Sequence, residues 1–124
     1  MPRVLLVENE ENIQKLVKVN LAASGYDVLI ASEGEKGLEL ARQKIPDLIL
    51  LDLRLPGMSG WDVLTELKAE PQLKDIPVVI VTAMVGQANE AKARDMGAAG
   101  YLGKPFTAGE VLREVRKALG QEAV

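Results

Sequence analysis

The sequence predicts an α/β fold in which strand and helix alternate five times around one parallel sheet. Short runs of consecutive apolar residues recur along the chain, and the segments between them carry apolar residues at helical spacing. Consecutive apolar runs rich in β-branched residues are typical of strands that are buried on both faces of a parallel sheet. Right-handed crossovers through the intervening helices then place helices on both faces of that sheet.

Five strands are expected from the apolar runs. They lie at residues 4–7, 28–30, 48–51, 78–81 and 100–102, and the last run is the weakest. Pro46 and Pro77 come shortly before two of these strands, where a missing backbone amide costs little. The 124 residues contain no long linker or repeat, so residues 1–120 are expected to form one domain, with a short frayed tail at 121–124.

Helical spacing is clearest after the first strand and near the end of the chain. The first apolar face comprises Ile13, Leu16, Val17 and Leu21, and the last comprises Val111, Leu112, Val115, Ala118 and Leu119. Gly25 and Gly120 follow these segments, at the position where glycine commonly ends a helix. The segment between residues 86 and 96 has only alanines as apolar residues in its middle. It is expected to dock weakly, either as part of a conformational switch or simply as a poor surface helix.

Two helix starts carry the capping-box pattern, in which Ser or Thr is followed three residues later by Glu. One pair is Ser32 with Glu35, and the other is Thr107 with Glu110. Ser32 and Thr107 are therefore both expected to be N-cap residues.

The composition excludes several kinds of site. The chain has no cysteine and no histidine, which excludes disulfides, thiol catalysis, histidine general bases and metals held by His or Cys. Its 15 basic and 18 acidic residues give a net charge of −3, so no basic surface for nucleic acid is expected. The apolar run at 4–7 ends at Glu8 and is too short for a signal peptide or a membrane span. A cytoplasmic protein without direct contact to nucleic acid or membrane is expected.

The residues that end the predicted strands bring acidic groups, a hydroxyl and an ammonium to one edge of the sheet. Residues 8–11 (ENEE) follow the first strand, Asp52 the third, Thr82 ends the fourth, and Lys104 lies just beyond the fifth. Ligands of open parallel sheets bind outside the carboxyl ends of the strands. Carboxylates gathered there suit a hard cation such as Mg²⁺. A carboxylate nucleophile, Mg²⁺ with open water positions and a lysine together indicate phosphoryl transfer.

Five motifs at these strand ends carry a family resemblance. They are residues 4–8 (VLLVE), 46–53 (PDLILLDL), 55–60 (LPGMSG), 77–83 (PVVIVTA) and 101–106 (YLGKPF). In this order and spacing, they make essentially the whole chain resemble the receiver domains of bacterial two-component response regulators, in particular the single-domain chemotaxis-regulator type. The resemblance implies a flavodoxin-like three-layer sandwich with strand order 2-1-3-4-5. It also implies a signalling protein and not an enzyme, apart from self-phosphorylation and slow self-dephosphorylation.

The resemblance assigns roles to individual residues at this edge. Asp52 matches the phospho-acceptor, which takes a phosphoryl group from a phosphohistidine on a sensor histidine kinase or a histidine phosphotransfer protein. Glu8 matches one of the two acidic metal-site positions, and the backbone carbonyl of Arg54 matches a further ligand of Mg²⁺. Lys104 matches the cation that contacts the phosphoryl oxygens, and its bond to Pro105 is expected to be cis.

Two further residues match the family's switch. Thr82 corresponds to the hydroxyl that contacts the phosphoryl group, and Tyr101 to the aromatic residue that changes rotamer on activation. Tyr101 as ordinary half-buried packing remains an alternative. In the family, a downstream protein binds the face formed by the fourth helix, the fifth strand and the fifth helix.

One position departs from the family pattern. The second acidic metal-site position matches Asn9, which offers a carbonyl oxygen but no charge. Weaker Mg²⁺ binding is therefore expected, and Glu10, the next residue along, would reach the site if the loop shifted by one residue. The alternative is a pseudo-receiver, which binds partners through the same fold without being phosphorylated.

Enzyme alternatives fit the residues poorly. A dehalogenase-like phosphatase needs a second Asp two positions after the nucleophile, where this chain has Arg54. A flavodoxin shares the expected strand order, but its first loop must hold a phosphate. The acidic residues 8–11 would repel one.

Overall fold

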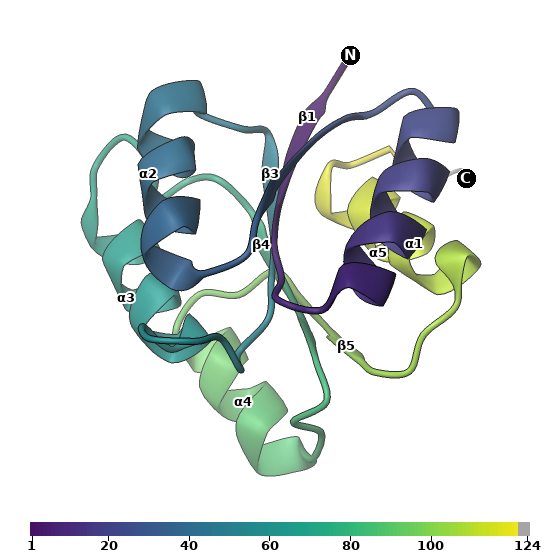
Figure 1. The fold of residues 1–124 in the computed structure, drawn as a ribbon. Coiled ribbons are helices and arrows are strands. Elements are labelled where there is room, and N and C mark those ends of the chain that lie inside the picture. Colours follow the sequence, from purple (N-terminus) through teal and green to yellow (C-terminus); the bar gives the residue numbers. More distant parts are fainter. Residues whose placement is uncertain (122–124) are drawn as a thin grey trace.

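A five-stranded parallel sheet with the order β2-β1-β3-β4-β5 forms the centre of the molecule. The computed structural model describes residues 1–121, in which five strands alternate with five helices (Figure 1). The strands are β1 (Arg3–Val7), β2 (Asp27–Ala31), β3 (Leu48–Leu51), β4 (Val78–Thr82) and β5 (Gly100–Gly103). The helices are α1 (Glu11–Ala23), α2 (Gly34–Lys44), α3 (Gly60–Ala69), α4 (Gln87–Asp95) and α5 (Ala108–Ala118). The predicted element order and strand order are both confirmed.

The helices form two outer layers. Figure 1 shows α1 and α5 together on one face of the sheet and α2, α3 and α4 on the other. Alternate residues of the central strands enter two separate cores: Leu5 and Val7 of β1 pack toward α2 and α3, while Val4 and Leu6 pack toward α1 and α5. Apart from Arg3 at the start of β1, the three central strands are buried, because helices cover both of their faces.

The two edge strands differ from the sequence-based expectation. The three residues of the apolar run in β2 are only partly buried, and β5 is partly buried after Gly100. Both strands pair with a neighbour on one side only. An apolar run of this kind therefore predicts a strand without distinguishing the centre of the sheet from its edge.

Helix ends confirm three of the four predicted signals. Gly25 and Gly120 have φ angles of 93° and 71° and follow α1 and α5. Thr107 forms a complete capping box with Glu110 at the start of α5. The prediction for Ser32 is wrong: α2 begins after Glu33, and the Ser32 hydroxyl instead accepts a hydrogen bond from Gln14 Nε2 at 3.2 Å.

The two Ser/Thr positions predict different responses to mutation. Thr107→Ala is expected to lower the free energy of unfolding by about 1 kcal/mol, because the amide of Glu110 loses its capping partner. Ser32→Ala is expected to change it by less than about 0.5 kcal/mol, because Ser32 is exposed and caps no helix. Urea unfolding followed by circular dichroism measures both. Equal losses at the two positions would contradict the assignment of the caps.

Helix α4 is the least embedded of the described helices, as expected. Ala93 is its one buried residue, and Lys92 Nζ lies 4.2 Å from the centre of the Trp61 ring on α3. Gln121, the first residue of the expected tail, accepts a hydrogen bond from the Tyr26 hydroxyl at 2.7 Å through its side chain. Residues 122–124 of that predicted tail lie outside the described residues. No helix within residues 1–121 is long and apolar enough to cross a membrane.

Candidate functional site

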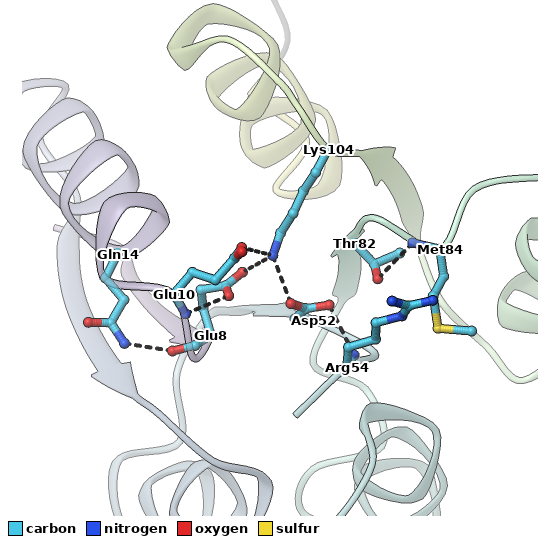
Figure 2. A network of polar contacts seen from close by, with 8 residues as sticks. All are labelled: Glu8, Glu10, Gln14, Asp52, Arg54, Thr82, Met84 and Lys104. Atoms are coloured by element: carbon cyan, nitrogen blue, oxygen red, sulfur yellow. Dashed lines mark hydrogen bonds and ion pairs between the residues drawn. The ribbon is translucent and has the colours of Figure 1, made fainter. Parts of the chain in front are cut away.

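The carboxyl ends of four strands meet at one edge of the sheet. Asp52 follows β3 directly, and its backbone amide donates to the carbonyl of Val7 in β1 at 3.0 Å. Lys104 follows β5, and its amide donates to the carbonyl of Thr82 in β4 at 2.8 Å. These backbone bonds extend the sheet by one residue and thereby fix where the two side chains begin. The predicted gathering of these residues at one edge is confirmed (Figure 2).

Lys104 is the centre of the site. Its Nζ lies 2.9 Å from Glu8 Oε1, 2.7 Å from Glu10 Oε2 and 2.8 Å from Asp52 Oδ2 (Figure 2). The Lys104 side chain is 11% exposed, whereas those of Glu8 and Asp52 are 0% and 5% exposed. Water therefore screens these charges little. The peptide bond between Lys104 and Pro105 is cis, as predicted.

Glu8 is a carboxylate removed from solvent. Burial raises its pKa above the ordinary value, and the charge of Asp52 acts in the same direction, while the hydrogen bonds from Lys104 and the Glu10 amide oppose them. Its Oε2 accepts from that amide at 3.0 Å. Among the described side chains, Glu8 Oε1 is the buried oxygen that accepts no well-directed hydrogen bond, although the Lys104 ammonium contacts it.

The ammonium of Lys104 responds to its partners. Burial acts to lower the pKa of Lys104, but hydrogen bonds to Asp52, Glu10 and Glu8 outweigh burial and raise it well above the ordinary value. Lys104 therefore stays protonated throughout the physiological range and acts here as a fixed positive charge.

Asp52 presents its carboxylate to an open pocket. Its Oδ1 accepts from the backbone amide of Arg54 at 3.1 Å, and its Oδ2 faces Lys104. The pocket has a volume of about 270 Å³ and is lined by Asn9, Glu10, Asp52, Arg54, Ala83 and Lys104. A carboxylate held at both oxygens and open to the pocket is oriented for attack on a ligand that enters there.

Thr82 and Tyr101 both contact the loop between β4 and α4. The buried Thr82 hydroxyl accepts from the Met84 amide at 3.2 Å, and the Tyr101 hydroxyl donates to the Met84 carbonyl. Tyr101 is half-buried, and burial raises its pKa. Figure 2 shows Asp52 between Glu8 on one side and Thr82 on the other. The structure thus brings Glu8, Asp52 and Lys104 into direct contact and connects Thr82 and Tyr101 through the neighbouring loop.

The residues at the pocket fit a hard cation such as Mg²⁺. The available donors are carboxylate oxygens of Glu8 and Asp52, the Asn9 amide oxygen and the backbone carbonyl of Arg54, all of the type that Mg²⁺ prefers. Glu8 Oε1 is buried and accepts no well-directed hydrogen bond, so it is available as such a ligand. Within residues 1–121, no group of three or more acidic side chains is arranged to hold a metal ion, so a cation here would also need the Asn9 amide, the Arg54 carbonyl and water as ligands.

Two further residues contact the site more closely than the sequence predicted. Glu10 contacts Lys104 without any shift of the loop, although the two residues are 94 positions apart. Gly60, at the start of α3, lies so close to the Asp52 backbone that a Cβ there would approach its carbonyl oxygen to 2.2 Å. The glycine at the end of the LPGMSG motif was the one sequence signal for the approach of Gly60 to Asp52. The position of Glu10 next to Asn9 suggested that it could reach the site, but nothing in the sequence indicated its contact with Lys104.

Comparison with known proteins identifies the family of this chain. The sequence model of the "response regulator receiver domain" family matches residues 4–116. The chain belongs to this family. Its members are signalling domains of two-component systems, which agrees with the carboxylate, lysine and threonine found at the sheet edge.

Individual relatives cover the chain almost completely. It is 43% identical over 119 residues to the DNA-binding dual master transcriptional regulator RpaA of Synechocystis, although the match spans only 49% of that regulator's length. It is 37% identical over 121 residues to the polar-differentiation response regulator DivK of Brucella anthropi, and here it spans 98% of the relative.

A solved receiver domain shows the same fold with a metal bound. The receiver domain of the sensor histidine kinase PA1611 from Pseudomonas aeruginosa superimposes with a TM-score of 0.87 at 28% identity, covering 96% of this chain and 98% of that one. In that structure a magnesium ion is coordinated in the active-site cleft.

Proposed function

We propose that this receiver domain accepts a phosphoryl group on Asp52 from a phosphohistidine and thereby changes its protein-binding face. The observation that carries the proposal is the contact of Asp52 Oδ2 with Lys104 at the open pocket, beside the buried Glu8. The donor is a sensor histidine kinase or a histidine phosphotransfer protein, as for other members of the family. The 124 residues contain no histidine, so the phosphohistidine of the donor lies outside them.

The transfer requires a nucleophile, a means of neutralising charge and an open approach. An Asp52 oxygen forms the bond to phosphorus while the bond from phosphorus to the donor's imidazole nitrogen breaks, and the imidazole keeps that electron pair. The ammonium of Lys104 lies where it can contact an oxygen of the transferring group. Glu8, Asp52, Asn9 and the Arg54 carbonyl would hold Mg²⁺, which supplies additional positive charge to the phosphoryl oxygens when bound.

The switch follows from the β4–α4 loop. Thr82 presents its hydroxyl at the end of β4, and that hydroxyl now holds the Met84 amide. We propose that a phosphoryl group on Asp52 draws the Thr82 hydroxyl toward itself and releases this amide. The loop and Tyr101 then rearrange together, because the Tyr101 hydroxyl is bonded to Met84. Tyr101 lies on β5 and the loop leads into α4, so this rearrangement would reach the face formed by α4, β5 and α5, where a downstream protein would bind.

The test uses a small phosphodonor in place of the partner kinase. Incubation with acetyl phosphate and Mg²⁺ is expected to give a phosphoryl adduct on the wild-type protein, and none on Asp52→Asn, by intact-mass spectrometry. Thermal unfolding of both proteins controls for folding. Two results would refute the proposal: no adduct at saturating Mg²⁺ from a folded sample, or an equal adduct on the variant.

The first of these results would favour a pseudo-receiver. Asn9 is the observation behind that second candidate, since it removes one negative charge from the position expected to bind the metal. Such a protein would use the same α4–β5–α5 face without phosphorylation, inside the cytoplasm and without direct contact to nucleic acid.

A further inference from the structure

Asn9 leaves the metal site one charge short, and the neighbouring Glu10 lies where it can make up the difference. Both residues line the pocket into which Asp52 projects. Asn9 supplies a neutral amide, whereas Glu10 supplies a carboxylate. The identity of the site rests on the function proposed above. The role of Glu10 within it rests on this chain's own contacts.

The backbone of Glu10 is fixed, but its side chain serves no structural purpose in the helix that it precedes. Glu10 is the N-cap residue of α1, and its side chain makes no capping hydrogen bond there. Its amide donates to Glu8 Oε2, and its carbonyl accepts from the amide of Gln14. N-caps are usually Ser, Thr, Asp or Asn, whose short side chains bond the first turn. The longer Glu10 side chain instead turns toward the pocket.

The Glu10 carboxylate already forms an ion pair within the site. Its Oε2 lies 2.7 Å from Lys104 Nζ, the shortest of the three ion contacts of that ammonium. Three carboxylates therefore share one ammonium, and the ionised site carries two net negative charges. Without Glu10 the site would carry one net negative charge, because the ammonium of Lys104 would offset one of the two remaining carboxylates. A divalent cation that enters beside Glu8 and Asp52 would then meet half of the negative charge.

The Glu10 carboxylate is also free to follow an incoming cation. Its side chain is 60% exposed, in contrast to the buried side chain of Glu8. Moving it costs little desolvation, whereas moving Glu8 would disrupt the core of the site. A long, exposed side chain on a fixed backbone can exchange Lys104 for a cation or a hydrated cation without any change in the loop.

We infer that Glu10 supplies the negative charge that Asn9 lacks and thereby sustains Mg²⁺ binding at the pocket that Asp52 and Arg54 line, next to the buried Glu8. The same carboxylate holds Lys104 while no cation is bound. Glu10 is thus a positioning residue for the metal and for the lysine, and it does not take part in bond making.

The test measures Mg²⁺ binding directly, without phosphorylation. The Mg²⁺-dependent rise in Tm gives an apparent Kd, with NaCl at matched ionic strength as the reference because salt screens exposed charges. Glu10→Gln is expected to weaken Mg²⁺ binding about tenfold. Glu11→Gln is the matched control, since Glu11 is exposed in the first turn of the same helix, and it is expected to change the Kd less than about twofold.

A rescue completes the test. Adding Asn9→Asp to Glu10→Gln is expected to restore the Kd to the wild-type value or below, because the charge returns to the neighbouring position. An unchanged Kd for Glu10→Gln, or equal losses for Glu10→Gln and Glu11→Gln, would overturn the inference.

Binding by the wild type separates this inference from the proposed function. If Asn9→Asp binds Mg²⁺ and the wild type does not, Glu10 fails to compensate for Asn9 while the site itself stands. If neither protein binds Mg²⁺, both the inference and the proposed phosphorylation fail.

Discussion

Gly60→Ala is expected to lower the free energy of unfolding by about 3 kcal/mol, because the new methyl group has no space to occupy. An ideal Cβ at this position lies 2.2 Å from the Asp52 carbonyl oxygen and 2.5 Å from Leu53 Cα. Both are backbone atoms, so no side-chain rotation relieves the overlap. The Gly60 amide also donates to the Leu53 carbonyl at 2.9 Å. Separating α3 from this segment would break that bond and shift the backbone that carries Asp52.

Gly109→Ala is the matched control for this prediction. It also lies in the first turn of a helix, but the nearest atom to its ideal Cβ is 3.9 Å away. Alanine has the higher helix propensity, so Gly109→Ala is expected to be neutral or to stabilise by up to about 1 kcal/mol. Urea unfolding compares the two variants, and acetyl phosphate labelling checks whether Gly60→Ala also reduces the adduct on Asp52. Similar stabilities for the two variants would contradict the argument from close approach.

The fold was predictable because its signals repeat along the chain. Five apolar runs separated by helical segments admit few arrangements once crossovers must be right-handed. Details decided by neighbouring elements were not predictable. Ser32 and Thr107 carry the same capping pattern, yet only Thr107 caps a helix. The start of α2 depends on how it packs against the rest of the protein, which a four-residue pattern does not contain.

The candidate site was also predictable in one respect and not in another. Strand ends predicted which residues gather at the edge, since every parallel strand delivers its last side chain there. Which carboxylates pair with Lys104 was not predictable, because several acidic residues lie near its ammonium and the sequence does not specify their distances from it. Glu10 and Lys104 pair across 94 positions, and the exposed loop that carries Glu10 offers no periodicity from which such a contact follows.

Lys104→Met is expected to lower the free energy of unfolding by about 3 kcal/mol near neutral pH, because it leaves a buried carboxylate without its cation. Glu8 is fully buried, and Lys104 is the one charged donor that contacts it among the described residues. Methionine retains much of the aliphatic length of lysine, so lost packing contributes little. Urea unfolding in buffer with EDTA measures the effect without interference from bound cations.

Two further variants separate charge from shape. Adding Glu8→Gln to Lys104→Met is expected to recover most of the loss, since the amide needs no cation. Lys15→Met, at an exposed position on α1, is expected to change stability by less than about 0.5 kcal/mol. If the double variant were as unstable as Lys104→Met alone, the loss would lie in packing and the ion-pair argument would fail.

The pH dependence of the stability of Lys104→Met tests independently whether the buried Glu8 causes the loss. Without Lys104, burial and the charge of Asp52 raise the pKa of Glu8 with less opposition. A carboxyl whose pKa is higher in the folded state holds a proton that the unfolded state releases, so the folded state gains stability as pH falls. The stability of Lys104→Met should therefore decrease as pH rises from the ordinary Glu pKa of 4.5 through the raised value. The gap to wild type is expected to be wider at about pH 8 than at about pH 5. A constant gap would mean that Glu8 does not carry the effect.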